Sequence, residues 1–287
     1  MKVARRPGEL EPKPRSVAIG TFDGVHIGHQ AVVAAATTPG LVPTVVTFHP
    51  HPREVLGYDV ELVTTLERRL ELLEALGVEE TLVVEFTPEV AALAPEQFAE
   101  SYVIEVGARI VAAGESFRFG SARSGDLVLL ERLGLETRVV PILPGVSSTR
   151  IRQLLAAGEV REAARLLGRP VEVEGTVVSG DARGGTLGFP TANLRADHSL
   201  LVPKFGIYAG AALDHRAAVS IGINPHYGGA ERRIEAFLLD FTGDLYGQRV
   251  IVELWDRLRD EAAFESEAEL IDQIVLDVAA ARATTRP

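Results

Sequence analysis

Hydrophobic and polar positions follow two rhythms along this chain, one on each side of about residue 168. In the first part, short runs rich in β-branched residues alternate with longer segments whose apolar residues recur every three or four positions. We expect strands at residues 16–20, 44–48, 81–86, 109–113 and 138–143, and helices at 30–36, 64–76, 95–104, 125–133 and from 147 onward. This alternation predicts an α/β domain with a mostly parallel sheet.

The second part changes to short strand-like runs at close spacing. Residues 171–178 alternate with period two, and further runs follow at 207–213, 216–223, 233–241 and 248–254. Such spacing is typical of an antiparallel barrel or sandwich, and one helix is expected at about 265–281. We therefore predict two domains, at residues 13–167 and 168–287, preceded by a loose lead-in.

Composition supports two globular domains and excludes several other classes. Of the 287 residues, 46% are hydrophobic and 24% are charged, which is enough to bury a sizeable core. The net charge of −11 would repel nucleic-acid phosphates, so no nucleic-acid partner is expected. The chain has no cysteine, which excludes disulfides and thiolate chemistry. No apolar run approaches the ~20 residues of a membrane span, and no signal peptide is recognisable, so we expect a cytoplasmic protein without a membrane partner.

A motif that contains glycine and histidine follows the first predicted strand and reads GTFDGVHIGH at residues 20–29. Gly24 and Gly28 permit close backbone approaches. His26 and His29 are spaced so that both can point the same way from a helix start. At such a strand-to-helix junction they could hydrogen-bond phosphates and stabilise charge that develops in phosphoryl or nucleotidyl transfer. The alternative is a pair of surface histidines or loose metal ligands.

A second candidate phosphate-binding segment begins the helix predicted at residue 147. Ser147, Ser148 and Thr149 are followed by Arg150 and Arg152. Ser or Thr at a helix start is most often only a cap. Three hydroxyl residues and two guanidinium groups are more than a cap requires, and they suit a triphosphate.

These two motifs together resemble the nucleotidyltransferase superfamily, whose domains are Rossmann-like. More closely, the motif at 20–29, FHPHPRE at 48–54 and GESFRFG at 114–120 are similar to the FMN adenylyltransferase half of bacterial FAD synthetases. The resemblance covers about residues 15–165.

The resemblance implies roles for three groups of residues in the N-terminal half. Catalytic handling of the ATP phosphates is implied for His26, His29, Ser148, Thr149 and Arg152, with Arg150 a weaker candidate. Nucleotide binding is implied for Gly20, Phe22, Asp23, Gly24 and Gly28, and flavin binding for Phe48, Pro50, His51, Pro52, Ser116 and Phe117. The family usually has Asp or Asn at the position of Ser116, so we expect a rearranged hydrogen bond that weakens adenylylation without abolishing it.

The densest signal in the C-terminal half is a glycine-rich segment that leads into FPTANL at residues 189–194. Its backbone amides could cradle phosphates, although a glycine-rich barrel turn would have the same composition. Thr191 and Asn193 alternate on an extended segment and face the same side. Their two neutral oxygens could hold a Mg²⁺ ion that takes its other ligands from water and phosphate.

A carboxylate also stands within an otherwise apolar predicted strand, at Glu235. It could accept the proton of a substrate hydroxyl that attacks a γ-phosphate. A lone Glu in a strand more often faces solvent, so the strand alone leaves both readings open.

The same half resembles riboflavin kinase, a small six-stranded antiparallel barrel, over nearly all of residues 170–282. The resemblance rests on LGFPTANL at 187–194, PKFGIY at 203–208, IGINP at 221–225 and EAFLLDF at 235–241. It implies that Thr191 and Asn193 bind Mg–ATP, that Glu235 is the general base, and that Arg259 belongs to a flap near the flavin. A loop that covers the nucleotide is implied for Gly180, Asp181, Arg183, Gly184 and Gly185.

Two positions depart from the commonest riboflavin kinase pattern. His226 stands where Thr often follows Asn-Pro, and Phe237 stands where His often lies two residues after the Glu. Neither removes a group that the chemistry needs.

The two halves together resemble the bifunctional riboflavin kinase/FAD synthetases of bacteria. The resemblance implies phosphorylation of riboflavin to FMN in the C-terminal half and adenylylation of FMN to FAD in the N-terminal half, with Mg²⁺ as cofactor and ATP, riboflavin and FMN as substrates. The alternatives are a monofunctional riboflavin kinase with an inactive N-terminal domain and a non-catalytic flavin or nucleotide sensor. A tRNA-charging relative, suggested by HIGH at residues 26–29, is disfavoured because the chain has no basic anticodon-binding domain. Monomer and weak homo-oligomer both stay open.

Overall fold

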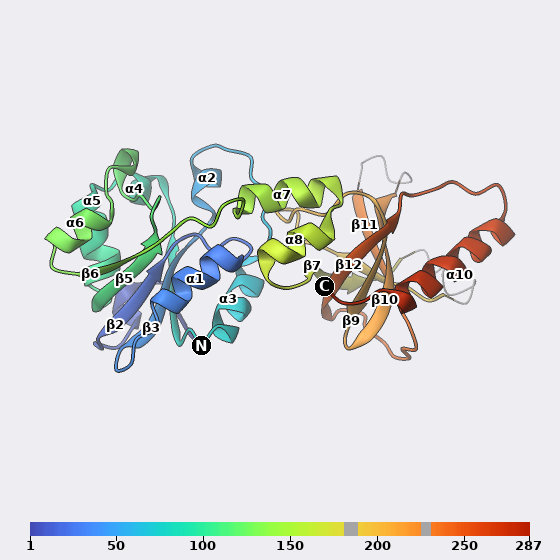
Figure 1. The fold of residues 1–287 in the computed structure, drawn as a ribbon, viewed down its shortest axis with the longest axis horizontal. Helices are drawn as coiled ribbons and strands as arrows, with labels where there is room; N and C mark the ends of the chain where they lie inside the picture. Colours follow the sequence, from blue (N-terminus) through green and yellow to red (C-terminus); the bar gives the residue numbers. More distant parts are fainter. Residues whose placement is uncertain (181–188, 225–230) are drawn as a thin grey trace. The chain divides into compact units, whose positions relative to one another are not determined.

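The computed structural model describes residues 1–180, 189–224 and 231–287, which form two compact units, Met1–Ser148 and Thr149–Pro287 (Figure 1). The predicted loop residues Asp181, Arg183, Gly184 and Gly185, and the departing position His226, lie outside the described residues.

The first unit is built on a six-stranded parallel sheet with the strand order β1-β4-β3-β2-β5-β6. Its strands are β1 (Lys2–Ala4), β2 (Arg15–Ile19), β3 (Val42–His49), β4 (Glu80–Glu85), β5 (Ala108–Gly114) and β6 (Glu136–Val140). Its α-helices are α1 (Ile27–Ala35), α2 (Pro52–Val55), α3 (Leu66–Ala75), α4 (Pro88–Ala92), α5 (Pro95–Ala99) and α6 (Leu127–Arg132). Short turns of other helix types are η1 (Pro7–Glu9), η2 (Glu100–Ile104) and η3 (Ser121–Arg123).

The expectation of a loose lead-in is wrong for the first residues, because Lys2–Ala4 form the edge strand β1. They pair in parallel with β4, from Lys2 opposite Glu80 to Ala4 opposite Leu82. Ala4 is fully buried there. A strand of three residues carries too little periodicity to be recognised, and its place is decided by the open edge of β4.

Both faces of this sheet are covered. Val17 and Ile19 of β2 enter a core that includes Phe98 of α5, whereas Ala18 between them enters a core that includes Val33 of α1 and Leu73 of α3. Helices therefore flank the sheet on both sides (Figure 1). The strand order reverses at β2, which has β3 on one side and β5 on the other. In such doubly wound sheets, ligands bind beyond the carboxyl ends of the strands at this reversal.

The second unit contains a closed six-stranded barrel with the strand order β10-β11-β8-β7-β12-β9, and every neighbouring pair is antiparallel. The strands are β7 (Val171–Val178), β8 (Ala192–Arg195), β9 (Gly206–Ala212), β10 (His215–Asn224), β11 (Glu231–Leu238) and β12 (Arg249–Arg259). The helices are α7 (Ser148–Ala157), α8 (Val160–Leu167) and α10 (Glu267–Ala283). The predicted order of an α/β domain followed by an antiparallel barrel is confirmed.

Hydrogen bonds and ion pairs hold the C-terminal end of the long helix α10, and the residues that follow it, to the barrel. Arg282 makes two hydrogen bonds of 2.8 Å to the carboxylate of Asp240, and Arg286 makes bonds of 2.9 and 2.6 Å to that of Glu253. Arg216 donates to the carbonyl of Ala281 at 3.2 Å. Each exposed ion pair contributes little free energy, so the attachment of α10 depends on several such contacts together.

Candidate active sites

The histidine pair of the first unit lies directly beyond the carboxyl end of β2. His26 is the N-cap of α1, and its Nδ1 accepts a hydrogen bond of 3.2 Å from the backbone N–H of His29. The two rings stack, with centroids 3.6 Å apart and 15° between their planes. A Cβ at Gly28 would lie 3.2 Å from the His26 ring, so the glycine leaves room for this stacking. The two imidazoles therefore lie side by side at the strand-order reversal.

His29 is held in its neutral form. Burial lowers its pKa well below the ordinary 6.5, and the nearby charges of His26 and Arg69 lower it further. Its Nδ1 is buried and has no hydrogen-bond partner among the described residues. Phe22 packs edge-on against the ring at 5.3 Å. A neutral imidazole near pH 7 can bind a phosphate by a hydrogen bond but not by charge.

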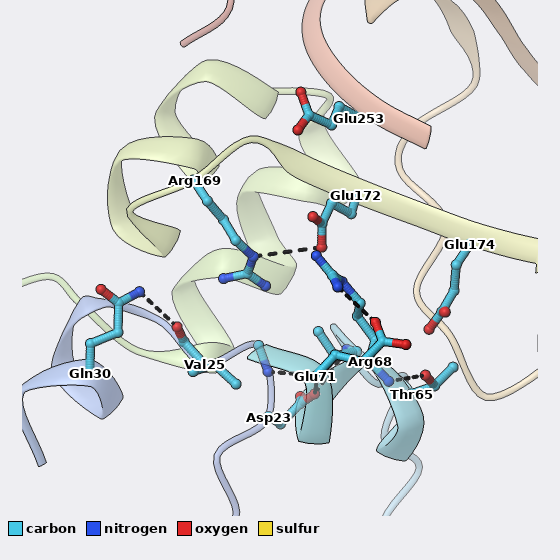
Figure 2. A network of polar contacts seen from close by, with 12 residues as sticks. Asp23, Val25, Gln30, Thr65, Arg68, Glu71, Arg169, Glu172, Glu174 and Glu253 are labelled. Atoms are coloured by element: carbon cyan, nitrogen blue, oxygen red, sulfur yellow. Dashed lines mark hydrogen bonds and ion pairs between the residues drawn. The ribbon is translucent and has the colours of Figure 1, made fainter. Parts of the chain in front are cut away.

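Asp23 fixes the loop between β2 and α1. Its buried carboxylate accepts hydrogen bonds from the backbone N–H groups of Val63 at 3.0 Å and Thr64 at 3.1 Å, and the Thr64 hydroxyl accepts one of 3.1 Å from Gly24 N–H. Gln30 bonds the carbonyl of Val25 at 3.0 Å and closes the same loop (Figure 2). These bonds tie the glycine–histidine motif to the segment that precedes α3.

Arg69 on α3 is a further charged group near the histidines, and the sequence analysis missed it. Its side chain is 1% exposed, and its Nη1 donates to the carbonyl of Phe48 at 3.2 Å. Burial lowers the pKa of Arg69, while the nearby Asp23 raises it. Its Nε has no partner among the described residues. Its burial could have been inferred from the sequence, because Arg69 lies between Leu66 and Leu73 on the apolar stripe of the helix.

The other predicted residues of this half are distributed between the core and the surface. Phe22 and Phe48 are buried, and Phe48 packs against Phe86 with ring centroids 5.7 Å apart. His51 caps α2 by accepting a bond of 3.1 Å from Arg53 N–H. The remaining predicted positions lie on loops or at the start of α2, namely Gly20, Pro50, Pro52, Ser116 and Phe117. Flavin contact by any of them stays a prediction.

The hydroxyl segment meets the motif through Ser148. Its Oγ donates a hydrogen bond of 3.0 Å to the carbonyl of Asp23. Thr149, Arg150 and Arg152 follow on the first turn of α7, within the second unit. Their approach to the histidine pair stays a prediction.

The second unit holds a cavity of about 330 Å³. Its walls include Thr191, Glu235, Phe237, Arg259, and Leu270 and Ile274 of α10. Phe237 meets Phe189 edge to face, with ring centroids 5.4 Å apart. Small-molecule sites are of this kind, mostly apolar with a few convergent polar groups. The departure at Phe237 therefore adds apolar surface to the cavity.

Glu235 and Asn193 stand opposite each other on the neighbouring strands β11 and β8. Arg233, two residues before Glu235 on β11, forms an ion pair with it and donates to Asn193 Oδ1 at 3.4 Å. A Cβ at Gly180 would lie 2.4 Å from the side-chain amide of Asn193, so a larger residue there would displace that amide. Arg233 was missed because charged residues are ordinary in strands that face solvent.

The donors of this second site fit a hard cation. Thr191 supplies a hydroxyl on the cavity wall, and Asn193, opposite Glu235 on the neighbouring strand, supplies an amide oxygen that also accepts from Arg233 at 3.4 Å. Mg²⁺ prefers such oxygen ligands and completes its shell with water and substrate phosphates.

Comparison with known proteins matches each half of the chain to a family. A family model described as FAD synthetase matches residues 9–150, and one described as riboflavin kinase matches residues 167–285. The bifunctional riboflavin kinase/FMN adenylyltransferase of Bacillus subtilis is 36% identical over 93% of this chain and 92% of its own length. The chain belongs to this bifunctional family. The family member from Escherichia coli strain K12 is 35% identical over 98% of this chain and 97% of its own length.

A solved structure matches the chain as a whole. A crystal structure from Streptococcus pneumoniae, described as a macrolide-efflux protein, gives a TM-score of 0.89 over 99% of each chain, with 33% identity. In the described part of the present chain, none of the helices is long and apolar enough to cross a membrane. The family resemblance inferred from the motifs is confirmed. Each matched domain of this bifunctional family member contains one of the two candidate sites.

Proposed function

We propose that the chain makes FMN from riboflavin and ATP in the barrel, and FAD from FMN and ATP at the histidine pair. The observation that carries the first reaction is the position of Glu235 on the wall of an apolar cavity, with Thr191 on the same wall and Asn193 opposite Glu235 on the neighbouring strand. The observation that carries the second is the stacked pair of His26 and His29 at the strand-order reversal of a doubly wound sheet.

In the kinase reaction, Glu235 accepts the proton of the terminal ribityl hydroxyl of riboflavin. The freed oxygen forms a bond to the γ-phosphorus of ATP, and the bond from that phosphorus to the β-bridging oxygen breaks, so that ADP leaves. Arg233 orients the Glu235 carboxylate through their ion pair. The apolar walls hold the flavin ring and exclude water from the transfer.

In the adenylylation, a phosphate oxygen of FMN forms a bond to the α-phosphorus of ATP, and pyrophosphate leaves. His26 and His29 hydrogen-bond the phosphate oxygens on which charge accumulates. Ser148, Thr149 and Arg152 are proposed to hold the departing pyrophosphate, and Phe48, Pro50, His51, Pro52, Ser116 and Phe117 to border the flavin. His29 is neutral near pH 7, so its contribution is directional rather than ionic.

Mg²⁺ is the proposed cofactor, held in the barrel by Thr191 and Asn193. Bound there, the ion would neutralise phosphate charge as the γ-phosphoryl group is transferred. Gly180 is proposed to lie under the nucleotide because a side chain at this position would displace the Asn193 amide. Asp181, Arg183, Gly184 and Gly185 are proposed to continue this loop.

The deciding experiment is chromatography of the products formed from riboflavin, ATP and Mg²⁺ over time. We expect FMN first and FAD later, and no product when a chelator removes the metal. FMN that accumulates alone would indicate a monofunctional kinase, and Ser116 would be the first position to examine. Flavin binding without conversion would indicate a sensor.

Three further assignments are proposals of the same kind. They are a cytoplasmic location, a monomeric or weakly associating state, and a functional boundary at residues 167/168. A functional boundary there would leave the first turn of α7 with the adenylylation site.

A further inference from the structure

A partly buried ion pair at the barrel cavity joins β12 to α10. Arg259 Nε donates to Asp277 Oδ1 at 2.9 Å, and its Nη2 donates to Oδ2 at 2.7 Å. Asp277 is 7% exposed, and Gln273 Nε2 donates to its Oδ1 at 3.0 Å. Both charged residues line the cavity. The two parallel bonds fix the plane of the guanidinium as well as its position.

Asp277 occupies a place where an apolar residue would be expected. Leu270, Ile274 and Asp277 are spaced by four and three residues, so they lie on one face of α10, and all three line the cavity. A buried carboxylate must be desolvated, and packed apolar residues often stabilise a fold at least as well as a buried ion pair. Stability alone therefore does not explain a carboxylate at this position. Its role in positioning the Arg259 guanidinium does.

The strand alone does not set the direction of Arg259. The pairing of β12 with β9 shifts register between Arg257 and Arg259, so the regular alternation of side chains is broken there. The guanidinium is held instead by Asp277, by a bond of 2.9 Å from Nη1 to the Asp260 carbonyl, and by the ring of Phe264 at 5.9 Å. A guanidinium has five N–H groups. Two remain beyond these contacts among the described residues.

We infer that Asp277 is a positioning residue for riboflavin binding, which acts by holding Arg259 in the cavity wall. The two remaining N–H groups of Arg259 then meet a hydrogen-bond acceptor of the ligand. A flavin ring offers carbonyl oxygens along one edge, and the apolar cavity suits the rest of the ring. This inference rests on the proposed kinase function. It adds Asp277 as the residue that orients Arg259 toward the flavin in that site.

The test uses the full chain and compares Asp277→Asn with the unaltered protein. The amide keeps the size of the side chain but cannot accept two charge-assisted bonds from Arg259. We expect the KM for riboflavin to rise about tenfold, as the loss of one oriented hydrogen bond to a charged group would give, while kcat changes by less than about threefold. FAD formation from supplied FMN should not change. The matched control is Asp272→Asn, an exposed position on the same helix, which should leave both activities unchanged.

A double-mutant cycle separates positioning from a merely structural role. If Asp277 acts through Arg259, then Asp277→Asn should change the KM by less than about twofold in an Arg259→Met background. An equal rise in KM with and without Arg259 would overturn the inference, and so would an unchanged KM in Asp277→Asn.

Two further measurements keep the outcome decisive. If Asp277→Asn loses its folded barrel, the double variant Arg259→Met with Asp277→Leu leaves no unpaired buried charge, and its KM should equal that of Arg259→Met alone. A different KM would overturn the inference. If the unaltered chain makes no FMN, the proposed kinase function fails. Quenching of riboflavin fluorescence then still compares the Kd of the two proteins, and equal values would overturn the inference.

Discussion

The two candidate sites are built in opposite ways. The histidine pair comes from ten consecutive residues at the end of one strand, and backbone hydrogen bonds around Asp23 hold its loop in place. The barrel site draws its polar groups from β11, β12, α10 and the segment that leads into β8, and these side chains surround a cavity. A site made from one short segment is visible as a motif, whereas a site made from several elements is visible only after folding.

The two sites also differ in how they treat charge. In the barrel, Glu235 is paired with Arg233 and Arg259 with Asp277. Near the histidine pair, the described contacts leave the Nε of the buried Arg69 without a partner, and His29 stays neutral. We therefore expect the barrel to depend on individual ion pairs and the histidine site to depend on pH.

The largest expected effect comes from removing the proposed base of the barrel. Glu235→Gln keeps the shape of the side chain but cannot accept a proton, so FMN formation should fall by about 10²–10⁴-fold. FAD formation from supplied FMN should persist. Chromatography of both products from one preparation measures the two effects together. Equal loss of both activities would contradict two separate sites.

The reciprocal change is His29→Ala, with a slightly smaller expected effect. Loss of one hydrogen bond to the developing charge should lower FAD formation by about 10²-fold, with FMN formation retained. His198→Ala is the matched control because the His198 side chain is fully exposed. A variant that loses FMN formation instead would reverse the assignment of the two halves.

A pH series sharpens the contrast in charge. The folded-state pKa of His29 lies below its ordinary value of 6.5, so the unfolded chain binds more protons in that range. The free energy of unfolding of the first unit should therefore fall as the pH drops below 6.5. Melting curves between pH 7.5 and pH 5, values chosen to bracket about 6.5, measure this loss.

Two variants locate the source of this pH dependence. His29→Gln should reduce the dependence on pH. Arg69→Met should raise the pKa of His29 in an NMR titration, because it removes a like charge nearby. A His29 pKa that is unchanged in Arg69→Met would show that Arg69 does not contribute, and would leave burial and the charge of His26 as the causes.

The smallest expected effect is at Ser116, an exposed residue of the loop after β5. Ser116→Asn restores a residue that the family commonly has there, and we expect FAD formation to rise by less than about tenfold, as one recovered hydrogen bond would give. FMN formation should stay constant. A fall in FAD formation would show that the serine is adapted to this chain.

The sequence predicted regular elements best where the pattern was continuous. The β-branched run at 44–48 became β3, and the apolar stripe at 64–76 became α3 with Gly77 after it in the left-handed region. The start of α1 was placed three residues late, since His26 is an unusual N-cap and the helix begins at Ile27. Edge strand β1 was missed because the exposed edge of β4, not its own three residues, determines it.

The same reasoning applies to the sites. His26, His29, Thr191 and Glu235 could be named because motif or strand context singled them out. Arg69 and Asp277 could not, because packing decides that these charged residues are buried. Arg233 could not, because a charged residue in a strand ordinarily faces solvent. One signal was available for Arg69 and Asp277: each is a charge in line with apolar residues three or four positions away on its helix.

The attachment of α10 to the barrel through Arg282 and Arg286 has a practical consequence for handling the protein. A carboxypeptidase that trims the chain past Arg282 would remove the pairs with Glu253 and Asp240. The helix whose other half lines the barrel cavity would then be held by fewer contacts. Ageing of a preparation would therefore appear as a selective loss of FMN formation while FAD formation continued, and intact mass would have to be checked before any kinetic difference is assigned to a substitution.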